Sequence, residues 1–96
     1  MKAYCIVYET IDNEKMFSEY RAQVVPTIEA YGGRFLVRGG AFTVLEGVMP
    51  FTRIAMLEFP SRQKAEDWYR SPAYQRILPL RTQASRSQFV VADGVE

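Results

Sequence analysis

The amino-acid sequence predicts an α+β fold whose elements follow the order β, α, β, β, α, β. Three observations lead to this prediction. Four short runs are rich in strand-forming residues, two longer stretches repeat apolar residues at spacings of three and four, and a glycine pair separates the first helical stretch from the next strand. A chain of 96 residues has the length of one small domain. We therefore expect residues 1–96 to form a single domain.

The first strand is expected between Lys2 and Thr10. Successive side chains of a strand point to opposite faces of a sheet. One face of this run carries Ala3, Cys5 and Val7, and the other carries Tyr4, Ile6 and Tyr8. Both faces are apolar, although a sheet with helices on one side alone has polar residues on the other side. A second layer of protein is therefore expected on the remaining face.

The first helical region follows directly. Asp12 or Asn13 caps it, and Glu14 is favourably placed in its first turn. Apolar residues then recur at helical spacing along one side, at Met16, Phe17, Tyr20, Val24, Ile28 and Tyr31. Pro26 interrupts this pattern because its ring clashes with the carbonyl group four residues earlier. We expect either a kink or two helices that meet near Val25.

Two glycine pairs bound the second strand. Gly32–Gly33 supplies the positive φ that ends helices, and Arg34–Val37 has the composition of a strand. Gly39–Gly40 then bends or bulges that strand. The extended pattern resumes over Phe42–Glu46, and Gly47–Pro50 forms a turn.

The second half of the chain alternates strand and helix again. Arg53–Phe59 is the third strand, with apolar residues on both faces. Ser61 caps a helix, and Ser71–Pro72 starts another, because proline fits the first helical position after a cap. We expect Pro79 to end or kink this last helix, and Ser87–Asp93 to form the fourth strand.

This order of elements is that of a ferredoxin-like plait with a four-stranded antiparallel sheet. Because its strands are apolar on both faces, we expect helices on one face and the sheet of a second copy on the other. The sequence thus predicts a two-fold symmetric homodimer that pairs through its sheet faces.

Composition disfavours several classes of partner. Basic and acidic residues nearly balance, 12 against 11, and no run of Lys or Arg forms a surface for nucleic acid. The third strand lacks the basic-glycine-aromatic motif of RNA-recognition domains. The apolar stretch near the N-terminus is too short to span a membrane, and a single cysteine fits a reducing compartment. We expect a cytoplasmic protein without a nucleic-acid or membrane partner.

The chain contains no histidine, which removes the usual catalytic triads and most transition-metal sites. Its glycine pairs match neither the P-loop nor the dinucleotide-binding pattern. Cys5 has no histidine to act as its base, so we interpret it as a buried, inert thiol. We therefore predict no bound metal and no cofactor.

Four motifs occur together in this chain: YGGRFLVRGG at 31–40, VLEG at 44–47, LEFPS at 57–61 and WYRSPAYQ at 68–75. With them, the sequence from Lys2 to about Asp93 resembles a bacterial family, domain of unknown function 1330, of the dimeric α+β barrel superfamily. The resemblance implies a ferredoxin-like protomer whose sheet meets that of a second copy, and it implies no established activity. More distant relatives include cofactor-free monooxygenases, isomerases and dehalogenase-like enzymes, which is an analogy of fold alone.

Arg38 and Glu58 are the first candidate site residues. The second and third strands should be antiparallel neighbours, which would bring this arginine and this carboxylate together. Because a guanidinium binds carboxylates in bidentate fashion, Arg38 would anchor an anionic ligand, and Glu58 would orient the Arg38 side chain. The alternative is an ion pair that fixes the strand register or the dimer contact. A regular pleat puts Arg34 on the side of Arg38, where Arg53 would enlarge the basic patch, unless both are solvated strand ends.

Helix aromatics are the second group of candidates, namely Tyr20, Trp68, Tyr69 and Tyr74. They should face the sheet, where their polar tips would line a cleft for a flat organic ligand. Ordinary core packing is the alternative.

Three functions remain open. The first is a homodimer that binds a small organic molecule, anionic or aromatic, in the cleft between helices and sheet. The second is a cofactor-independent enzyme, monooxygenase-like or isomerase-like, in which Glu58 or a tyrosine moves a proton. The third is a structural or partner-binding dimer without a ligand. The sequence does not decide whether the protein is an enzyme.

Overall fold

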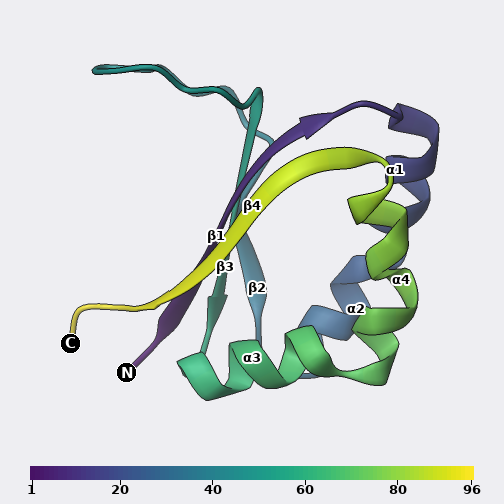
Figure 1. Cartoon of the computed structure of the whole chain (residues 1–96). Helices are drawn as coiled ribbons and strands as arrows, with labels where there is room; N and C mark the ends of the chain where they lie inside the picture. Colours follow the sequence, from purple (N-terminus) through teal and green to yellow (C-terminus); the bar gives the residue numbers. More distant parts are fainter.

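The computed structural model describes residues 1–96, and its elements follow the predicted order with each helical region divided in two (Figure 1). They are β1 (Ala3–Ile11), α1 (Glu14–Arg21), α2 (Val24–Glu29), β2 (Arg34–Arg38), β3 (Arg53–Phe59), α3 (Arg62–Arg70), α4 (Pro72–Thr82) and β4 (Ser85–Asp93). The four strands form one antiparallel sheet in the order β2-β3-β1-β4. The ferredoxin-like α+β fold predicted from the sequence is therefore confirmed.

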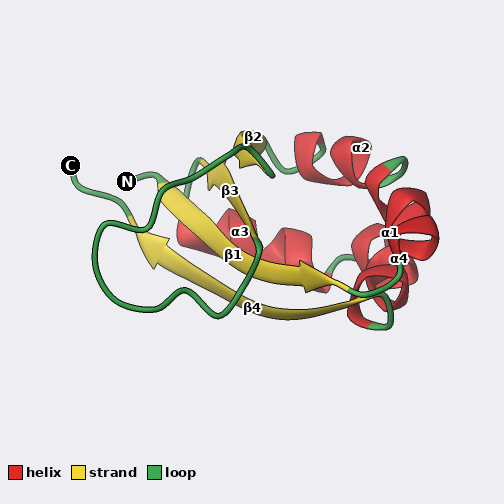
Figure 2. Ribbon diagram, turned by 90° about the horizontal axis from the view of Figure 1, so that it is seen from above, coloured by secondary structure: helices red, strands yellow, loops and turns green.

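All four helices lie on one side of the sheet, and no helix covers the other side (Figures 1 and 2). Burial along β1 alternates accordingly, with Ala3, Cys5 and Val7 buried and the residues between them partly exposed. The core between the two layers is rich in aromatic and branched side chains, among them Phe17, Ile28, Leu57, Phe59, Trp68, Tyr74 and Ile77. Burying this apolar surface is what holds the helices on the sheet.

Side-chain caps begin three of the helices, as predicted. Asn13 Oδ1 accepts a hydrogen bond from the backbone N–H three residues later at 3.0 Å, at the start of α1. Ser61 and Ser71 cap α3 and α4 in the same way, at 3.1 and 3.2 Å. Each cap satisfies an N–H that has no partner inside its helix.

Pro26 divides the first helical region into two helices, as predicted. α1 ends at Arg21 and α2 begins at Val24, so the break precedes Val25. Pro26 then lies in the first turn of α2, where its missing N–H would have had no partner within the helix. The clash of its ring with the Ala22 carbonyl of a continuous helix is avoided by this break.

Pro79 does not end α4, which continues to Thr82. Ile77 and Arg81, on either side of this proline, are both buried and keep the helix on both sides of it packed in the interior. The chain then reaches β4 within three residues, so this strand begins two residues earlier than predicted, at Ser85. None of the four helices is long and apolar enough to cross a membrane.

β2 and β3 are antiparallel neighbours, as predicted, but a β-bulge changes the faces of β2. Arg34 lies opposite Glu58, Leu36 is left without a partner, and Arg38 lies opposite Ala55. Because Glu58 and Ala55 are on different faces of β3, Arg34 points to the open side of the sheet and Arg38 to the helices. The prediction that these two arginines share a face assumed a regular pleat and is wrong.

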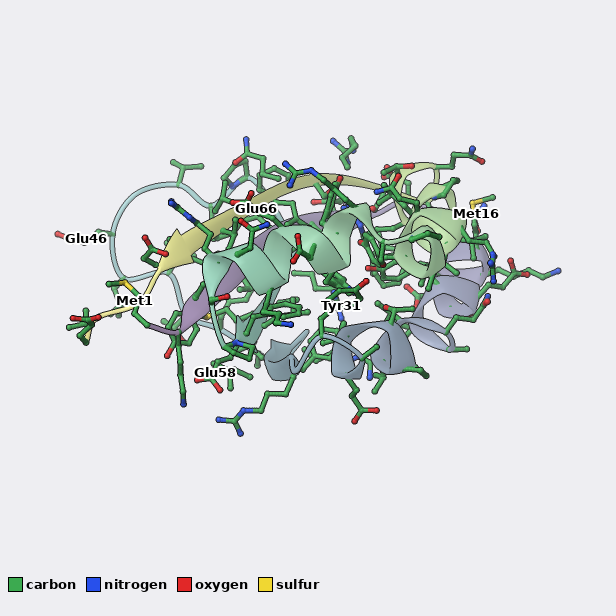
Figure 3. The ribbon with its side chains drawn as sticks, turned by 90° about the horizontal axis from the view of Figure 1, so that it is seen from below. Met1, Met16, Tyr31, Glu46, Glu58 and Glu66 are labelled. Carbon is green, nitrogen blue, oxygen red and sulfur yellow. The ribbon has the colours of Figure 1, made fainter.

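Residues 39–52 connect β2 to β3 without regular structure, so the extended segment predicted over Phe42–Glu46 is not a strand. The segment leaves the body of the protein on the side away from the helices (Figure 1, teal), and Glu46 lies at the outer edge of Figure 3. Phe42–Glu46 pairs with none of the four strands, and a strand needs a neighbour for its backbone hydrogen bonds. Its Leu45 and Val48 side chains are almost fully exposed.

The side of the sheet without helices is largely apolar, as predicted. We call it the open face, and its central residues are Tyr4, Ile6, Tyr8, Ile54, Met56 and Val90. None of them is buried in the protomer, and Val90 is 53% exposed. Exposed apolar surface of this kind is typical of protein interaction sites.

Candidate functional site

Arg38 and Glu58, the first pair predicted from the sequence, do not meet. Glu58 points to the open face, whereas Arg38 points to the helices and donates a hydrogen bond from Nη2 to the Arg21 carbonyl at 2.9 Å. In Figure 3, Glu58 is well separated from Met16 of α1, the helix that Arg38 contacts. The predicted proximity is wrong because the extra residue of the bulge reverses the side to which the rest of β2 points.

Glu58 instead belongs to a cluster at the edge of the open face. Its carboxylate accepts hydrogen bonds from Arg34 Nε at 2.9 Å and from the Tyr4 hydroxyl at 3.3 Å, and Lys2 Nζ lies at 3.5 Å. The hydrogen bond from Arg34 lowers the pKa of Glu58, an effect that the charges of Arg34 and Lys2 reinforce. A carboxylate with three such partners is held ionised.

The predicted helix aromatics fill the space between helices and sheet. The rings of Trp68 and Tyr74 are 4.2 Å apart, and the hydroxyls of Tyr20 and Tyr74 form a hydrogen bond of 2.8 Å. Trp68 Nε1 donates to Thr27 Oγ1 at 3.1 Å. Burial, together with the neighbouring Tyr74, raises the pKa of Tyr20 above its ordinary value. Tyr20, Trp68 and Tyr74 therefore belong to the packed core of the protein.

What remains between the layers is a small cavity whose walls are unusually basic. We call it the arginine cavity, after its four arginines: Arg21, Arg38, Arg53 and Arg81. Glu9 is the single acidic residue in its lining, and apolar residues of the core complete the wall. Its volume is about 20 Å³, which is room for about one water molecule.

Three of the four arginines also line a wider depression at the surface. Arg21, Arg38 and Arg53 surround it, Gly39 contributes to its wall, and its volume is about 590 Å³. We call it the mouth. Gly39 has a φ of +75°, and a Cβ at this position would lie 2.7 Å from Arg53 Nε. The guanidinium of Arg53 therefore occupies space that only glycine leaves free.

Each of the four guanidinium groups packs over an aromatic ring. Arg21 and Arg53 lie 5.0 and 5.3 Å from the ring centre of Phe17. Arg38 lies 4.6 Å from that of Phe35, and Arg81 lies 5.1 Å from that of Phe89. A ring attracts a cation through its quadrupole without neutralising its charge. The arginines are thus held in place while their charge stays available.

Carboxylate partners are fewer than arginines in this site. Arg21 pairs with Glu14 at 3.0 Å, and Arg53 pairs with Glu9. Arg38 forms no ion pair, and partial burial, followed by the charges of Arg53 and Arg21, lowers its pKa. Arg81, only 3% exposed, also has no carboxylate within ion-pair distance.

Arg81 is held by hydroxyl groups instead of a carboxylate. Its Nε donates to the Tyr74 hydroxyl at 3.3 Å, and its Nη1 donates to Ser87 Oγ at 2.7 Å. These acceptors are neutral, so they satisfy the guanidinium hydrogens without cancelling the charge. The site as a whole carries an excess of positive charge.

Glu9 is the acidic residue at the centre of this arrangement. It is on the middle strand β1, between Arg53 on β3 and Ser87 on β4 in the sheet register, and it is 2% exposed. Glu9 Oε1 accepts a hydrogen bond from Arg53 Nη1, whereas Glu9 Oε2 has no hydrogen-bond partner. A buried carboxylate oxygen without a partner is rare in proteins.

The predicted candidates divide among different places. Arg38, Tyr20 and Trp68 line the arginine cavity, whereas Glu58 does not. Tyr69 lines a separate groove of about 170 Å³ between α3 and β4, which Cys5 also borders. Burial raises the pKa of the Cys5 thiol to about 12, so the thiol stays protonated at neutral pH.

The sequence reasoning missed Glu9, Arg21 and Arg81. A signal for Glu9 was present, because it continues the alternation of the buried residues Ala3, Cys5 and Val7 on β1 and so had to point inward. Arg21 and Arg81 gave no comparable signal. They are charged residues in the last turns of helices, a position that usually faces solvent.

The fold and the site define a small α+β protein of the ferredoxin-like class, with a basic cavity between its helices and its sheet. The model of the DUF1330 family, a domain of unknown function, matches residues 2–95. The chain therefore belongs to this family, in agreement with the resemblance of its motifs.

Solved structures of similar fold span the whole chain. The RPA0582 protein of unknown function from Rhodopseudomonas palustris superposes with a TM-score of 0.79 at 16% identity, over 99% of this chain and 83% of that one. A dimeric ferredoxin-like protein of unknown function from Jannaschia sp. CCS1 gives 0.75 at 15% identity, over 98% and 100%.

SnoaB, a cofactor-independent oxygenase from Streptomyces nogalater, gives a TM-score of 0.63 at 8% identity, over 99% of this chain and 94% of that one. At such identities the likeness shows the fold alone. No functionally curated protein matches the chain.

Proposed function

We propose that the protein is a homodimer that binds a small organic anion, such as a carboxylate, at the mouth of the arginine cavity. The observation that carries this proposal is the set of three guanidinium groups around one opening, of which Arg38 has no acidic partner. A guanidinium presents parallel N–H donors that match the two oxygens of a carboxylate. Arg38 is the anchor in this proposal, as the sequence suggested, but without Glu58.

Charge and geometry favour an anion over a neutral ligand. The four arginines rest on aromatic rings, and only Glu9 and Glu14 are paired with any of them. Like charges held close together repel one another, and a bound anion relieves that repulsion. Partial burial is the main cause that lowers the pKa of Arg38, and the charges of Arg53 and Arg21 lower it further, which is the contribution of this repulsion.

The body of the ligand lies in the mouth and not in the interior. The arginine cavity has room for about one water molecule, whereas the mouth is open and much larger. A ligand in the mouth contacts Arg21, Arg38 and Arg53, and only a small group of it enters the cavity.

The open face is the proposed dimer contact. It presents a contiguous set of apolar side chains on three adjacent strands, and a second copy of the same face is complementary to it under two-fold symmetry. The dimeric protein from Jannaschia, which shares the fold, supports this arrangement. A cytoplasmic location remains a prediction, with which the single cysteine is consistent.

Anion binding is tested by NMR titration of the full-length protein with benzoate and with benzyl alcohol, its neutral counterpart, at low ionic strength. We expect benzoate to shift the amide signals of residues around Gly39 and to bind at least about 10-fold tighter than benzyl alcohol. Arg38→Gln should weaken benzoate binding by about 10-fold or more.

Arg34→Gln is the matched control, because Arg34 is on the same strand as Arg38 but points to the open face. It should leave benzoate binding unchanged. Equal weakening in both variants would mean that benzoate responds to overall charge and not to a site. No binding of benzoate by the wild type would refute the proposal and favour a dimer without a ligand.

A second candidate is a cofactor-independent enzyme that removes a proton from its substrate. The specific observation in its favour is Glu9 Oε2, a buried carboxylate oxygen without a partner at the wall of the arginine cavity. A base in such a position takes a proton when the substrate places a C–H or O–H group beside it. Glu9 replaces Glu58 as the proposed proton acceptor, because Glu58 does not line the cavity.

Proton removal is tested by exchange of the carbon-bound hydrogens next to the carbonyl group of phenylpyruvate for deuterium in D₂O. We expect the wild type to accelerate this exchange and Glu9→Gln to abolish the acceleration. Glu58→Gln serves as the control and should exchange like the wild type. Equal rates with and without the protein would exclude this second candidate for keto acids.

A further inference from the structure

The arginine cavity contains one feature that anion binding by the arginines does not use. Glu9 Oε2 is the only buried side-chain nitrogen or oxygen atom in the protein without a hydrogen-bond partner. The other oxygen of the same carboxylate is held by Arg53, which fixes the carboxylate in the cavity wall. A buried acceptor in a fixed orientation is a place for a hydrogen-bond donor.

The neighbouring side chains are engaged elsewhere. Ser87 Oγ, opposite Glu9 on β4, accepts a hydrogen bond from Arg81, and the Tyr20 hydroxyl is bonded to that of Tyr74. The cavity beside them measures about 20 Å³. That is enough for about one non-hydrogen atom with its hydrogen, such as a water molecule or a hydroxyl group.

The charge of the surroundings selects a neutral donor. The cavity is lined by four guanidinium groups but by only one carboxylate. An ammonium group entering this space is repelled by more charges than attract it, whereas a hydroxyl group carries no net charge. The donor that suits Glu9 is therefore an O–H group.

Arg53 sets the distance between that hydroxyl group and the anionic group of the ligand. Its Nη1 donates to Glu9 and the same residue also lines the mouth, so Arg53 borders both binding positions. An acid group in the mouth and a hydroxyl group at Glu9, both beside Arg53, suit a ligand that carries the two groups on the same or adjacent carbon atoms.

We propose that the ligand is a 2-hydroxy acid, whose carboxylate is bound by Arg38 and Arg53 and whose hydroxyl group donates a hydrogen bond to Glu9 Oε2. This inference rests on the proposed anion site and adds the chemical class of its ligand. The remainder of the molecule extends into the mouth. Glu9 thus determines specificity, and the arginines supply the attraction for the acid group.

The test compares three acids of one shape by isothermal titration calorimetry of the full-length protein. Mandelate carries the hydroxyl group, phenylacetate lacks it, and phenylglycine replaces it with an ammonium group. We expect wild-type protein to bind mandelate about 10-fold tighter than phenylacetate. Phenylglycine should bind no better than phenylacetate.

Glu9→Gln keeps the shape of the side chain and removes its charge, so the preference for mandelate should fall to about threefold or less. If Glu9→Gln does not fold, the comparison of mandelate with phenylacetate on the wild-type protein still tests the proposal. Equal binding of mandelate and phenylacetate, both weakened by Arg38→Gln, would overturn the hydroxy acid and leave the anion site intact. Failure of both acids to bind would overturn the anion site as well. Tighter binding of phenylglycine would contradict the choice of a neutral donor.

Discussion

Glu9 and Arg53 lie directly opposite each other on β1 and β3, and they form an ion pair on the helix-facing side of the sheet. The carboxylate is 2% exposed and the guanidinium side chain 15% exposed. The pair therefore connects the interior of the protein to the mouth, with its negative member inside and its positive member at the opening. The two residues therefore differ in how much the protein is destabilised when the partner of each is removed.

Arg53→Gln should destabilise the protein more than Glu9→Gln. Loss of the arginine leaves a buried carboxylate without its partner, at a cost of about 3–5 kcal/mol. Loss of the carboxylate leaves a guanidinium that still reaches solvent and packs on Phe17. Urea unfolding at pH 7 measures both changes, and the double variant should lose less than the sum of the two. Equal losses would mean that Arg53 does not hold Glu9.

Gly39→Ala should disturb the mouth, whereas Gly40→Ala should not. Gly39 has a positive φ and lies against the Arg53 guanidinium, so a methyl group there is strained and displaces that side chain. Gly40 has open space around the position of a Cβ. We expect a loss of about 1–2 kcal/mol and weaker benzoate binding for the first variant. The second should stay within about 0.5 kcal/mol of the wild type in the same urea titration.

Tyr74→Phe should cost more stability than Tyr20→Phe. The Tyr74 hydroxyl is bonded both to the Tyr20 hydroxyl and to Arg81, so its removal leaves two buried groups without this partner. Removal of the Tyr20 hydroxyl leaves Tyr74 with Arg81. We expect about 1–3 kcal/mol for the first change and about 1 kcal/mol for the second. The reverse order in thermal or urea unfolding would contradict this network.

Stability should decline in alkaline solution. Burial raises the pKa of Cys5 from 9.0 to about 12, and burial also raises the pKa of Tyr20 and of Tyr74. Above pH 9 the unfolded chain releases protons that the folded chain retains, so the free energy of unfolding falls as the pH rises towards 12. The slope is about 1.4 kcal/mol per pH unit for each group that differs.

Urea unfolding at pH 7, 9 and 10.5 measures this decline. Cys5→Ala should reduce the slope between pH 9 and 10.5, because one of the three groups is then absent. The Cys5 thiol of the folded protein should also react slowly with a disulfide reagent at pH 8, and fast once urea unfolds the chain. A flat stability profile, or fast reaction in the folded state, would show that the thiol is accessible.

Val90→Lys should convert the proposed dimer into a monomer. Val90 lies opposite Ile6 on the open face and is half exposed in the protomer, so the lysine does not disturb the core. Its charge would be buried on dimerisation, and we expect the dissociation constant to rise on the order of 100-fold. Ala73→Lys, on the exposed side of α4, is the control for added charge. Sedimentation at several concentrations distinguishes the two outcomes, and a monomeric wild type would refute the dimer.

Much of the fold was predictable because local signals agreed with it. The side chains of Asn13, Ser61 and Ser71 cap three helices where the sequence placed the caps. Arg53–Phe59 is a strand with the predicted bounds. The exceptions occurred where a local signal had to compete with tertiary packing. Pro79 is a strong helix breaker by itself, but the buried residues on both sides of it keep α4 continuous.

The candidate site was less predictable, because it depends on strand register. Arg38 was identified as an anion anchor from its residue type and its place in the second strand. The sequence does not give the residues that lie beside it. One unpaired residue, Leu36, then decides that Arg38 joins Arg53 and not Glu58. A bulge of this kind has no reliable signature in a single sequence, since its energy depends on both strands.

The sequence by itself determined the order of strands and helices, the inward direction of the alternating residues on β1 and the apolar character of both faces of the sheet. Spacing and local backbone preferences set these features, and they act within a few residues. The tertiary structure alone decided that Arg21, Arg38, Arg53 and Arg81 surround Glu9. These residues come from two helices and three strands, and only packing the helices onto the sheet, in one register, brings their charges together.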